Sequence, residues 1–332
     1  MTENAIDVDG LALTYSDGTR AVDGVDLQVP SGEFFGFLGP NGAGKTTTIK
    51  VLATLLRPSG GRVRVLGHDV TEEPLAVRRS IGYMAQETSV DLDLTARENI
   101  RFACEAYGVP RAEREERIDE LLELVELDDV GDKQAEGFSG GMKKRLDAAT
   151  ALVHRPPLVF LDEPTTGLDP AARNRLWDYF ERINDEGTTI FLTTQYLEEA
   201  DYLCDRLGVI RAGEIVARGS PDELKREVGG EVLDVDIEDG EDRRERAASI
   251  VRESGLVDDA TIELTDDGVS VTTPRAREVG TDLLVALRDA GITVTGFNVR
   301  SPTLDDVFLA LTGEHIEADE AAAVDAQVEV SR

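Results

Sequence analysis

An eight-residue segment, GPNGAGKT at residues 39–46, constrains this chain more than any other feature. It fits the pattern G-x-x-x-x-G-K-[ST] in full. An apolar segment at residues 34–38, predicted to be a strand, precedes it, and a helical pattern over residues 46–56 follows it. Glycines let the backbone amides of such a loop point inward at phosphate oxygens, and the helix N-terminus adds the positive end of its dipole. The sequence therefore predicts a phosphate-binding loop in an α/β domain.

Individual residues of this loop receive roles from the same chemistry. The ammonium of Lys45 is expected to reach the β- and γ-phosphates of a nucleotide, and the hydroxyl of Thr46 is expected to bind Mg²⁺. The alternative is a chance glycine-rich loop, which the flanking strand and helix disfavour. The predicted nucleotide-binding residues of this segment are Gly39, Pro40, Asn41, Gly42, Ala43, Gly44, Lys45, Thr46 and Thr47.

A buried strand that ends in two acidic residues supplies the second half of the predicted site. Residues 158–161 are apolar, and Asp162 closes the segment. A carboxylate at a strand end can hold Mg²⁺ through water. Glu163 follows directly, where it is expected to polarise an attacking water as a general base does. A solvated loop glutamate is the alternative, but the position of Glu163 beside Asp162 favours the catalytic interpretation.

Several short motifs narrow the class of nucleotide-binding protein. Ser139, Gly140 and Gly141 open a predicted helix, which is a second helix N-terminus suited to an anion. A plain helix cap is the alternative, but other motifs accompany this one. They are Tyr15 near the N-terminus, Gln86 after YMA, Asp169 in GLD and Gln195 in TTQ. In this order the motifs resemble those of the ATP-binding cassette (ABC) ATPases, over about residues 6–228.

The resemblance implies a P-loop ABC ATPase cassette of the α/β class, with a mixed sheet core, an antiparallel β subdomain and a helical subdomain. It also implies that ATP and Mg²⁺ bind, and that the ring of Tyr15 is a platform for adenine. The residues implied around Mg²⁺ are Thr46, Gln86 and Asp162.

The residue that follows Thr193 and Thr194 departs from the family pattern. Gln195 stands where most ABC ATPases have histidine. Glutamine donates a hydrogen bond but cannot become cationic. The catalytic residues are therefore expected to be Glu163, as the base, and Gln195, as a sensor and positioner at the γ-phosphate.

The same resemblance implies partner chains. In ABC ATPases the Ser-Gly-Gly motif of one cassette closes over the ATP that another cassette holds. Ser139, Gly140 and Gly141 are then expected to complete the ATP site of a second copy, so a chain with one cassette forms a homodimer. Asp169 is also expected to bind ATP. The family also implies a separate transmembrane permease, which makes the chain a peripheral subunit at the cytoplasmic face of the cell membrane.

Two longer stretches point to a subfamily. TTQYLEEAD at residues 193–201 and SPTLDDVFLALTG at residues 301–313 resemble the drug-exporter ATPases typified by daunorubicin/doxorubicin resistance. This implies multidrug export, in which ATP hydrolysis drives a drug-like or other hydrophobic substrate through the permease. A plain amphipathic helix is the alternative for the second stretch, and the two interpretations are compatible.

The chain is long enough for more than one domain. We expect the cassette at residues 1–229, a small α+β accessory domain of ferredoxin-like element order at residues 230–313, and a disordered acidic tail at residues 314–332.

Residues 95–128 are helical in pattern and heavily charged. Their charge pattern indicates a solvated helix face. In the family that the chain resembles, this region is the helical subdomain that contacts the membrane partner. Residues 143–145 read as a basic patch on a helix surface.

Composition excludes some classes of function. With 67 acidic and 35 basic residues the net charge is −32, which repels nucleic acids. Only six of the basic residues are lysine. High acidity with few lysines is typical of organisms that keep molar salt in the cytoplasm, so a halophilic source is expected, with an ordinary acidic protein as the alternative. The N-terminus has no signal-peptide pattern, and no apolar run reaches the roughly 20 residues that cross a bilayer.

Two other functions compete with export. A soluble ABC ATPase that acts on DNA or ribosomes is disfavoured, because no sustained heptads separate the motifs and each motif occurs once. An ATP-gated regulator that does not hydrolyse ATP is disfavoured by the presence of Glu163.

Overall fold

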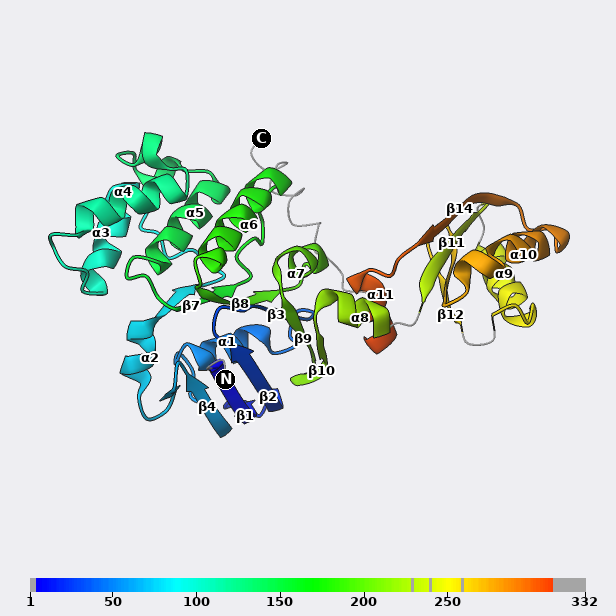
Figure 1. Ribbon diagram of the computed structural model, residues 1–332, viewed down its shortest axis with the longest axis horizontal. Coiled ribbons are helices and arrows are strands. Elements are labelled where there is room, and N and C mark those ends of the chain that lie inside the picture. Colours follow the sequence, from blue (N-terminus) through cyan, green and yellow to red (C-terminus); the bar gives the residue numbers. More distant parts are fainter. Residues whose placement is uncertain (1–3, 228–229, 239–240, 258–259, 313–332) are drawn as a thin grey trace. The chain divides into compact units, whose positions relative to one another are not determined.

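The computed structural model describes residues 4–227, 230–238, 241–257 and 260–312 (Figure 1). The chain divides into two units, one up to Ser220 and one from Pro221 onward, and each is described by itself. The tail at residues 314–332, predicted to be disordered, lies outside the described residues. Among the described helices, none has the length and apolar character that a membrane span requires.

A six-stranded mixed sheet carries the candidate site of the first unit. Its order is β10-β9-β3-β8-β7-β6, with every neighbouring pair parallel except β9 and β10. Three of its strands are buried along their whole length. Such burial is typical of apolar strands that are covered on both faces. The carboxyl ends of β3 and β7 meet at one edge of the sheet. The strands are β3 (Phe34–Leu38), β6 (Ile81–Met84), β7 (Leu158–Asp162), β8 (Thr189–Thr194), β9 (Arg206–Arg211) and β10 (Glu214–Gly219).

A four-stranded antiparallel sheet packs on the mixed sheet through one hydrophobic core. Its order is β2-β1-β4-β5, and β1 and β2 alternate buried and exposed residues as their sequences predict. In the shared core the ring of Phe191 lies 5.5 Å from that of Phe35, 5.8 Å from Phe37 and 5.7 Å from Phe160. The strands are β1 (Asn4–Thr14), β2 (Arg20–Pro30), β4 (Gly60–Val65) and β5 (His68–Asp69).

Four helices border these sheets: α1 (Lys45–Leu52), α2 (Pro74–Ser80), α6 (Pro170–Asp185) and α7 (Leu197–Leu203). The first is shorter than the predicted helix over residues 46–56. It ends at Leu52, because Thr54 adopts a left-handed conformation with φ of 62° that a right-handed helix cannot continue through.

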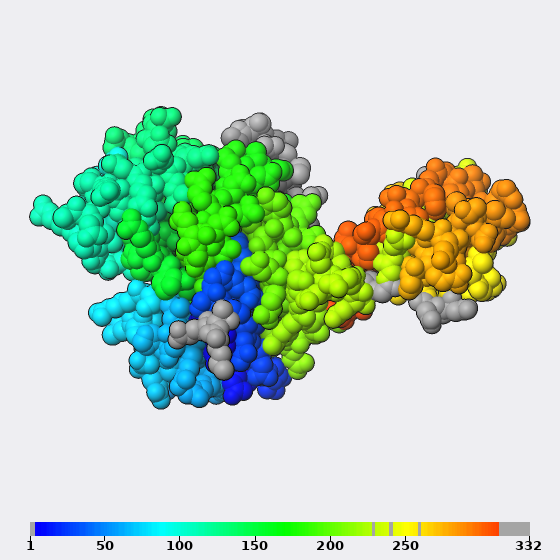
Figure 2. Space-filling view, in the orientation of Figure 1, coloured from blue at the N-terminus to red at the C-terminus, as the bar shows by residue number. Residues whose placement is uncertain are grey.

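Three further helices form a helical group at one side of the first unit: α3 (Ala96–Ala106), α4 (Arg114–Leu124) and α5 (Gly140–Ala151). The space-filling view shows this group in teal and green, apart from the strand-rich side that includes α2 (Figure 2). The charged stretch at residues 95–128 is therefore two helices. Gly108, with φ of 75°, and Pro110 separate them.

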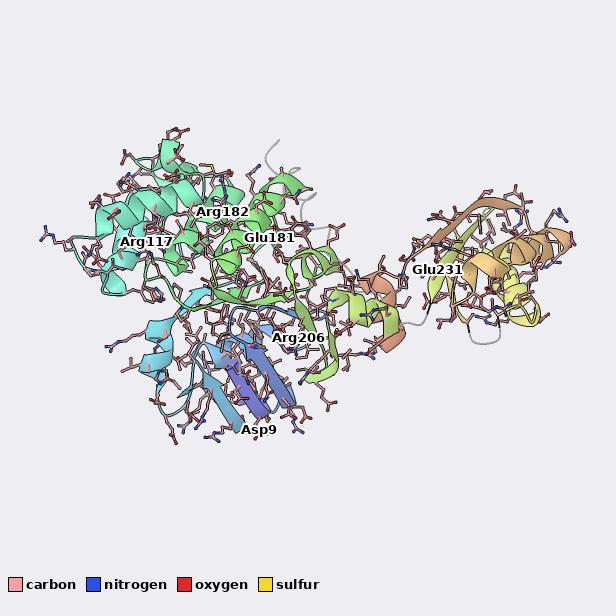
Figure 3. The ribbon with its side chains drawn as sticks, in the orientation of Figure 1. Asp9, Arg117, Glu181, Arg182, Arg206 and Glu231 are labelled. Carbon is pink, nitrogen blue, oxygen red and sulfur yellow. The ribbon has the colours of Figure 1, made fainter. Side chains whose placement is uncertain are left out.

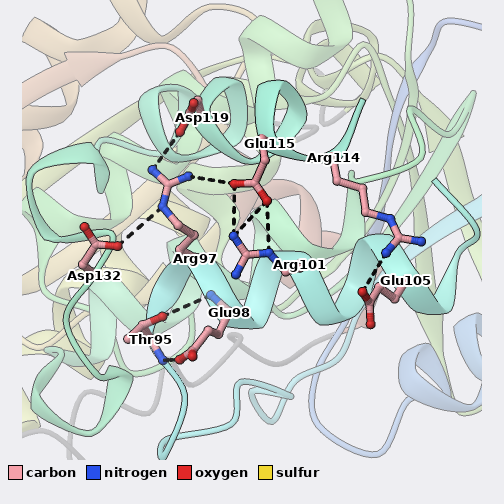
Figure 4. Close-up of polar contacts among 9 residues, drawn as sticks. All are labelled: Thr95, Arg97, Glu98, Arg101, Glu105, Arg114, Glu115, Asp119 and Asp132. Atoms are coloured by element: carbon pink, nitrogen blue, oxygen red, sulfur yellow. Dashed lines mark hydrogen bonds and ion pairs between the residues drawn. The ribbon is translucent and has the colours of Figure 1, made fainter. Parts of the chain in front are cut away.

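Most charges of this helical stretch pair with one another. Arg97 pairs with Asp119 at 2.7 Å, and Arg101 pairs with Glu115 at 2.9 Å (Figure 4). Thr95 and Glu98 form a capping box at the start of α3. These exposed pairs contribute little stability individually.

One arginine of α4 is buried and ties the helical group together. Arg117 donates to the carbonyl oxygens of Leu152 at 2.6 Å and Val153 at 3.2 Å (Figure 3). These carbonyls follow the last turn of α5, where a helix leaves its acceptors unpaired. The contact therefore holds α4 against the end of α5.

The second unit begins with α8 (Pro221–Glu227), which precedes the expected domain boundary at residue 230. Its antiparallel sheet has the order β12-β13-β11-β14, and the β-α-β-β-α-β succession matches the predicted ferredoxin-like order. The remaining elements are β11 (Glu231–Ile237), α9 (Glu241–Glu253), β12 (Thr261–Leu264), β13 (Gly268–Thr273), α10 (Ala276–Asp289), β14 (Val294–Arg300) and α11 (Leu304–Thr312).

Candidate functional site

The glycine-rich loop lies between β3 and α1, and a side chain would not fit at two of its glycines. Gly44 has φ of 107°, and a Cβ there would lie 2.4 Å from the Ala21 carbonyl oxygen. A Cβ at Gly39 would lie 2.3 Å from the Ile210 carbonyl oxygen. Only glycine is compatible with either position. These two glycines therefore let the loop pack directly against the backbone of β2 at Ala21 and of β9 at Ile210.

An open pocket of about 400 Å³ lies over this loop. Its residues come from the end of β1, the start of β2, the loop, α1, the segment after β6 and the end of β7. They are Tyr15, Thr19, Arg20, Ala21, Asn41, Gly42, Gly44, Lys45, Thr46, Thr47, Gln86 and Glu163. The hydroxyl of Tyr15 lies 3.0 Å from that of Thr47, which fixes the ring beside the helix start. Eight of the sixteen predicted ATP-binding residues thus line one pocket.

A buried ion pair lies at the base of the pocket. The ammonium of Lys45 lies 3.0 Å from Oε1 of Glu163, and these side chains are only 3% and 6% exposed. Lys45 also donates to the carbonyl oxygens of Gly39 at 2.8 Å and Pro40 at 3.1 Å. Oε2 of Glu163 accepts from the amide of Gln86 at 3.2 Å. A bound phosphate would compete with Glu163 for the ammonium of Lys45.

Two of the residues predicted around Mg²⁺ are in direct contact. The hydroxyl of Thr46 donates to Oδ1 of Asp162 at 3.1 Å, and the hydroxyl of Thr193 donates to the same oxygen at 2.7 Å. Burial raises the pKa of Asp162, and the two hydrogen bonds, which lower this pKa, oppose the effect. A hydroxyl and a carboxylate are hard oxygen donors that suit Mg²⁺. The third predicted residue, Gln86, contacts Glu163 instead.

Backbone strain orients Glu163. Its φ of 47° lies in the left-handed region, which is uncommon for a residue with a side chain. Its amide donates to the carbonyl oxygen of Thr193 at 3.0 Å and lies 3.2 Å from the hydroxyl of the same residue. Strained residues of this kind concentrate at functional sites. Here the strain places the carboxylate between Lys45 and Gln86.

The remaining predicted residues lie outside the pocket lining. Ser139 caps α5 through the amide of Met142 at 3.3 Å, and Asp169 caps α6 through the amide of Ala172 at 2.9 Å. A Cβ at Gly141 would lie 2.8 Å from the Cβ of Ala172, so the starts of α5 and α6 pack closely. Gly140 neighbours these residues. Gln195 follows β8 and is 5% exposed.

Two basic residues of the site were missed by the sequence analysis. Arg20 lines the pocket beside Tyr15. Lys144 does not lie on a free helix surface as expected, because its ammonium donates to the carbonyl oxygen of Gln86. Burial lowers the pKa of Lys144, and the nearby carboxylates of Asp162 and Glu163 oppose this. No local motif signals the contact of Lys144, since Lys144 and Gln86 lie 58 residues apart in the sequence.

Comparisons with known proteins identify the family of the chain. The model of the ABC transporter family matches residues 22–166, and that of the C-terminal domain of DrrA1-3-like ATP-binding proteins matches residues 219–312. The daunorubicin/doxorubicin resistance ATP-binding protein DrrA of Streptomyces peucetius is 46% identical over 93% of this chain and 92% of that protein. The linearmycin resistance ATP-binding protein LnrL of Bacillus subtilis is 35% identical over 88% of this chain and 93% of that protein.

A solved structure extends the likeness to the fold. The ATP-binding cassette MJ0796, described as a dimer in a post-hydrolysis state with ADP and Pi, is 26% identical with a TM-score of 0.60. The match covers 65% of this chain and 98% of that chain. The α/β cassette fold, with its mixed sheet, antiparallel sheet and helices, is confirmed.

Proposed function

The chain belongs to the ATP-binding proteins of ABC transporters, and on that premise we propose that it powers export of drug-like compounds through a separate permease. It is an ABC ATPase. The observation that carries the proposal is Glu163, held between Lys45 and Gln86 at the edge of the phosphate-binding loop. A carboxylate in this place can take a proton from an attacking water.

The roles of the pocket residues follow from their contacts. The loop amides and Lys45 bind the phosphates of ATP, and Tyr15 supports the adenine ring. Thr46 and Asp162, with Gln86, would hold Mg²⁺, which when bound neutralises charge on the phosphate oxygens. Glu163 accepts the proton of the attacking water. Gln195 donates a hydrogen bond toward the γ-phosphate and so senses its presence.

A second copy of the chain is proposed to complete each site. Ser139, Gly140, Gly141 and Asp169 lie together at the starts of α5 and α6, outside the pocket of their own chain. Two copies arranged head to tail would place these helix starts over the ATP of the partner. The dimer described for MJ0796 supports the pairing of two copies.

The permease and the location are proposals of the same kind. Relatives across nearly the whole chain are named for resistance to daunorubicin, doxorubicin or linearmycin. We therefore place the chain at the cytoplasmic face of the cell membrane, bound to a permease that carries the substrate path. No observation favours a non-transport ABC ATPase or an ATP-gated regulator.

Transport in a reconstituted system tests this function. The chain is expected to co-purify with a multi-span membrane protein encoded beside it. Vesicles that hold both proteins are expected to move daunorubicin only when ATP and Mg²⁺ are supplied on the side of the cassette. A matched preparation with Glu163→Gln should not transport. Transport that proceeds equally with this variant, or without ATP, would contradict the proposal.

We also propose that the acidity of the chain is an adaptation to molar salt. The charge of −32, with only six lysines, produces self-repulsion that salt screens. The screening length falls from about 10 Å at 0.1 M salt to about 3 Å at 1 M.

Activity and stability are therefore expected to rise with KCl up to molar concentrations. The measurements are ATP turnover and the thermal unfolding midpoint across a KCl series. KCl is preferred to a sulfate salt, since sulfate stabilises proteins by exclusion from their surface. Full activity and unchanged stability in dilute buffer would exclude this adaptation.

A further inference from the structure

Behind the pocket, one buried acidic side chain joins three elements that build the site. Glu199 lies on α7, four residues after Gln195, and its side chain is fully buried. Its Oε1 accepts hydrogen bonds from the hydroxyl of Thr165 at 2.9 Å and from the indole N–H of Trp177 at 3.0 Å. Thr165 follows Glu163 on the loop after β7, and Trp177 lies on α6. The carboxyl group therefore links this loop, α6 and α7.

The two carboxyl oxygens of Glu199 differ in their hydrogen-bond partners. Oε2 of Glu199 is buried and has no hydrogen-bond partner among the described residues. Burial raises the pKa of Glu199, opposed by Thr194, Thr165 and Trp177 and by the charge of Arg173. A buried carboxyl oxygen without a partner is costly, so the two hydrogen bonds to Oε1 are the chief contacts that hold the group in place.

The position of Gln195 depends on this junction. The side chain of Gln195 makes no hydrogen bond within the described part of the chain, so the backbone around it sets its place. On one side, the amide of Tyr196 donates to the hydroxyl of Thr194 at 2.9 Å. On the other, the guanidinium of Arg173 lies 4.9 Å from the centre of the Tyr196 ring. Glu199 then anchors the first turns of α7.

We propose that Glu199 is a positioning residue for ATP hydrolysis, which holds the Gln195 segment and the Glu163 loop in one arrangement through Thr165 and Trp177. Glu199 does not line the pocket, so it acts through its neighbours. The proposal rests on the proposed function, because it needs hydrolysis at the site of Glu163. Misplacement of reacting groups by about 1 Å costs up to roughly 100-fold in rate.

Three variants test the role. Glu199→Gln keeps the shape of the side chain and an acceptor oxygen for Thr165 and Trp177, so kcat is expected to stay within about twofold of wild type. Glu199→Met removes the acceptor and is expected to lower kcat at least about tenfold while the KM for ATP changes by less than about twofold. The control is Glu186→Gln at the exposed end of α6, which makes the same chemical change away from these contacts, and it is expected to match wild type.

Other outcomes decide against the proposal. Unchanged kcat in Glu199→Met, or a rise in KM as large as the fall in kcat, overturns it. A fall in kcat in Glu199→Gln as large as in Glu199→Met also overturns the proposal, since glutamine keeps the acceptor oxygen and should therefore preserve kcat. If Glu199→Met does not fold, Thr165→Val and Trp177→Phe each remove one donor and are expected to lower kcat with KM unchanged. If the wild-type protein hydrolyses ATP and the Glu163→Gln variant does not, the proposed function stands, whatever result the Glu199 variants give.

Discussion

Replacement of Glu163 by glutamine is expected to lower ATP turnover by roughly 100- to 10,000-fold, the range contributed by a positioned general base. Glutamine keeps the shape of the side chain and its contact with Gln86 but cannot accept the proton of the attacking water. The same change removes the carboxylate that pairs with Lys45 at 3.0 Å. ATP is therefore expected to bind at least as tightly as in wild type.

Two measurements separate these effects: phosphate release under saturating ATP, and the Kd of ATP by titration. Glu123→Gln makes the same chemical change at an exposed position of α4 and is the matched control. Turnover within a few-fold of wild type in Glu163→Gln would remove Glu163 from the role of base and leave the pocket as a binding site only.

Replacement of Lys45 by methionine is expected to weaken ATP binding by roughly 10- to 100-fold, the strength of a charge-assisted hydrogen bond. It is also expected to destabilise the fold by about 3 kcal/mol, because the buried carboxylate of Glu163 loses its cation. Combining Lys45→Met with Glu163→Gln removes both charges, so the double variant is expected to recover most of that stability.

The free energy of unfolding in urea measures this recovery, and ATP titration measures binding. Lys133→Met changes an exposed lysine in the same way and is expected to alter neither. A double variant no more stable than Lys45→Met alone would show that the ion pair does not account for the loss.

Much of this architecture was predictable because its signals are local. The strand, the glycine loop and the helix around Lys45 are contiguous in the sequence, so pattern and spacing specify them together. The same holds for Asp162, which ends an apolar run that only a buried strand explains. The break in the stretch at residues 95–128 was also visible in Gly108 and Pro110, although the charge pattern suggested one helical region.

The contacts within the site were not predictable in the same way. Glu163 meets Lys45 and Gln86 only because distant strands end at the same sheet edge, and its left-handed backbone has no sequence signal. Lys144 was expected on a surface, yet it reaches the carbonyl oxygen of Gln86 across the fold. Such contacts depend on tertiary packing, which cannot be predicted from the periodicity of apolar residues or from the spacing of motifs.

Mixing two inactive variants tests whether two copies of the chain share each ATP site. Lys45→Met disables the phosphate loop. Gly140→Asp places a negative charge at the start of α5, where a Cβ meets no atom of its own chain within 4 Å. Each homodimer then lacks complete sites, but a mixed dimer holds one intact site formed by the loop of one copy and the helix start of the other.

Equal mixing of the two variants is expected to restore roughly a quarter of wild-type ATP turnover, since half of the dimers would each have one of two sites intact. A mixture as inactive as the separate variants, measured after exchange of subunits has been verified, would contradict the shared site.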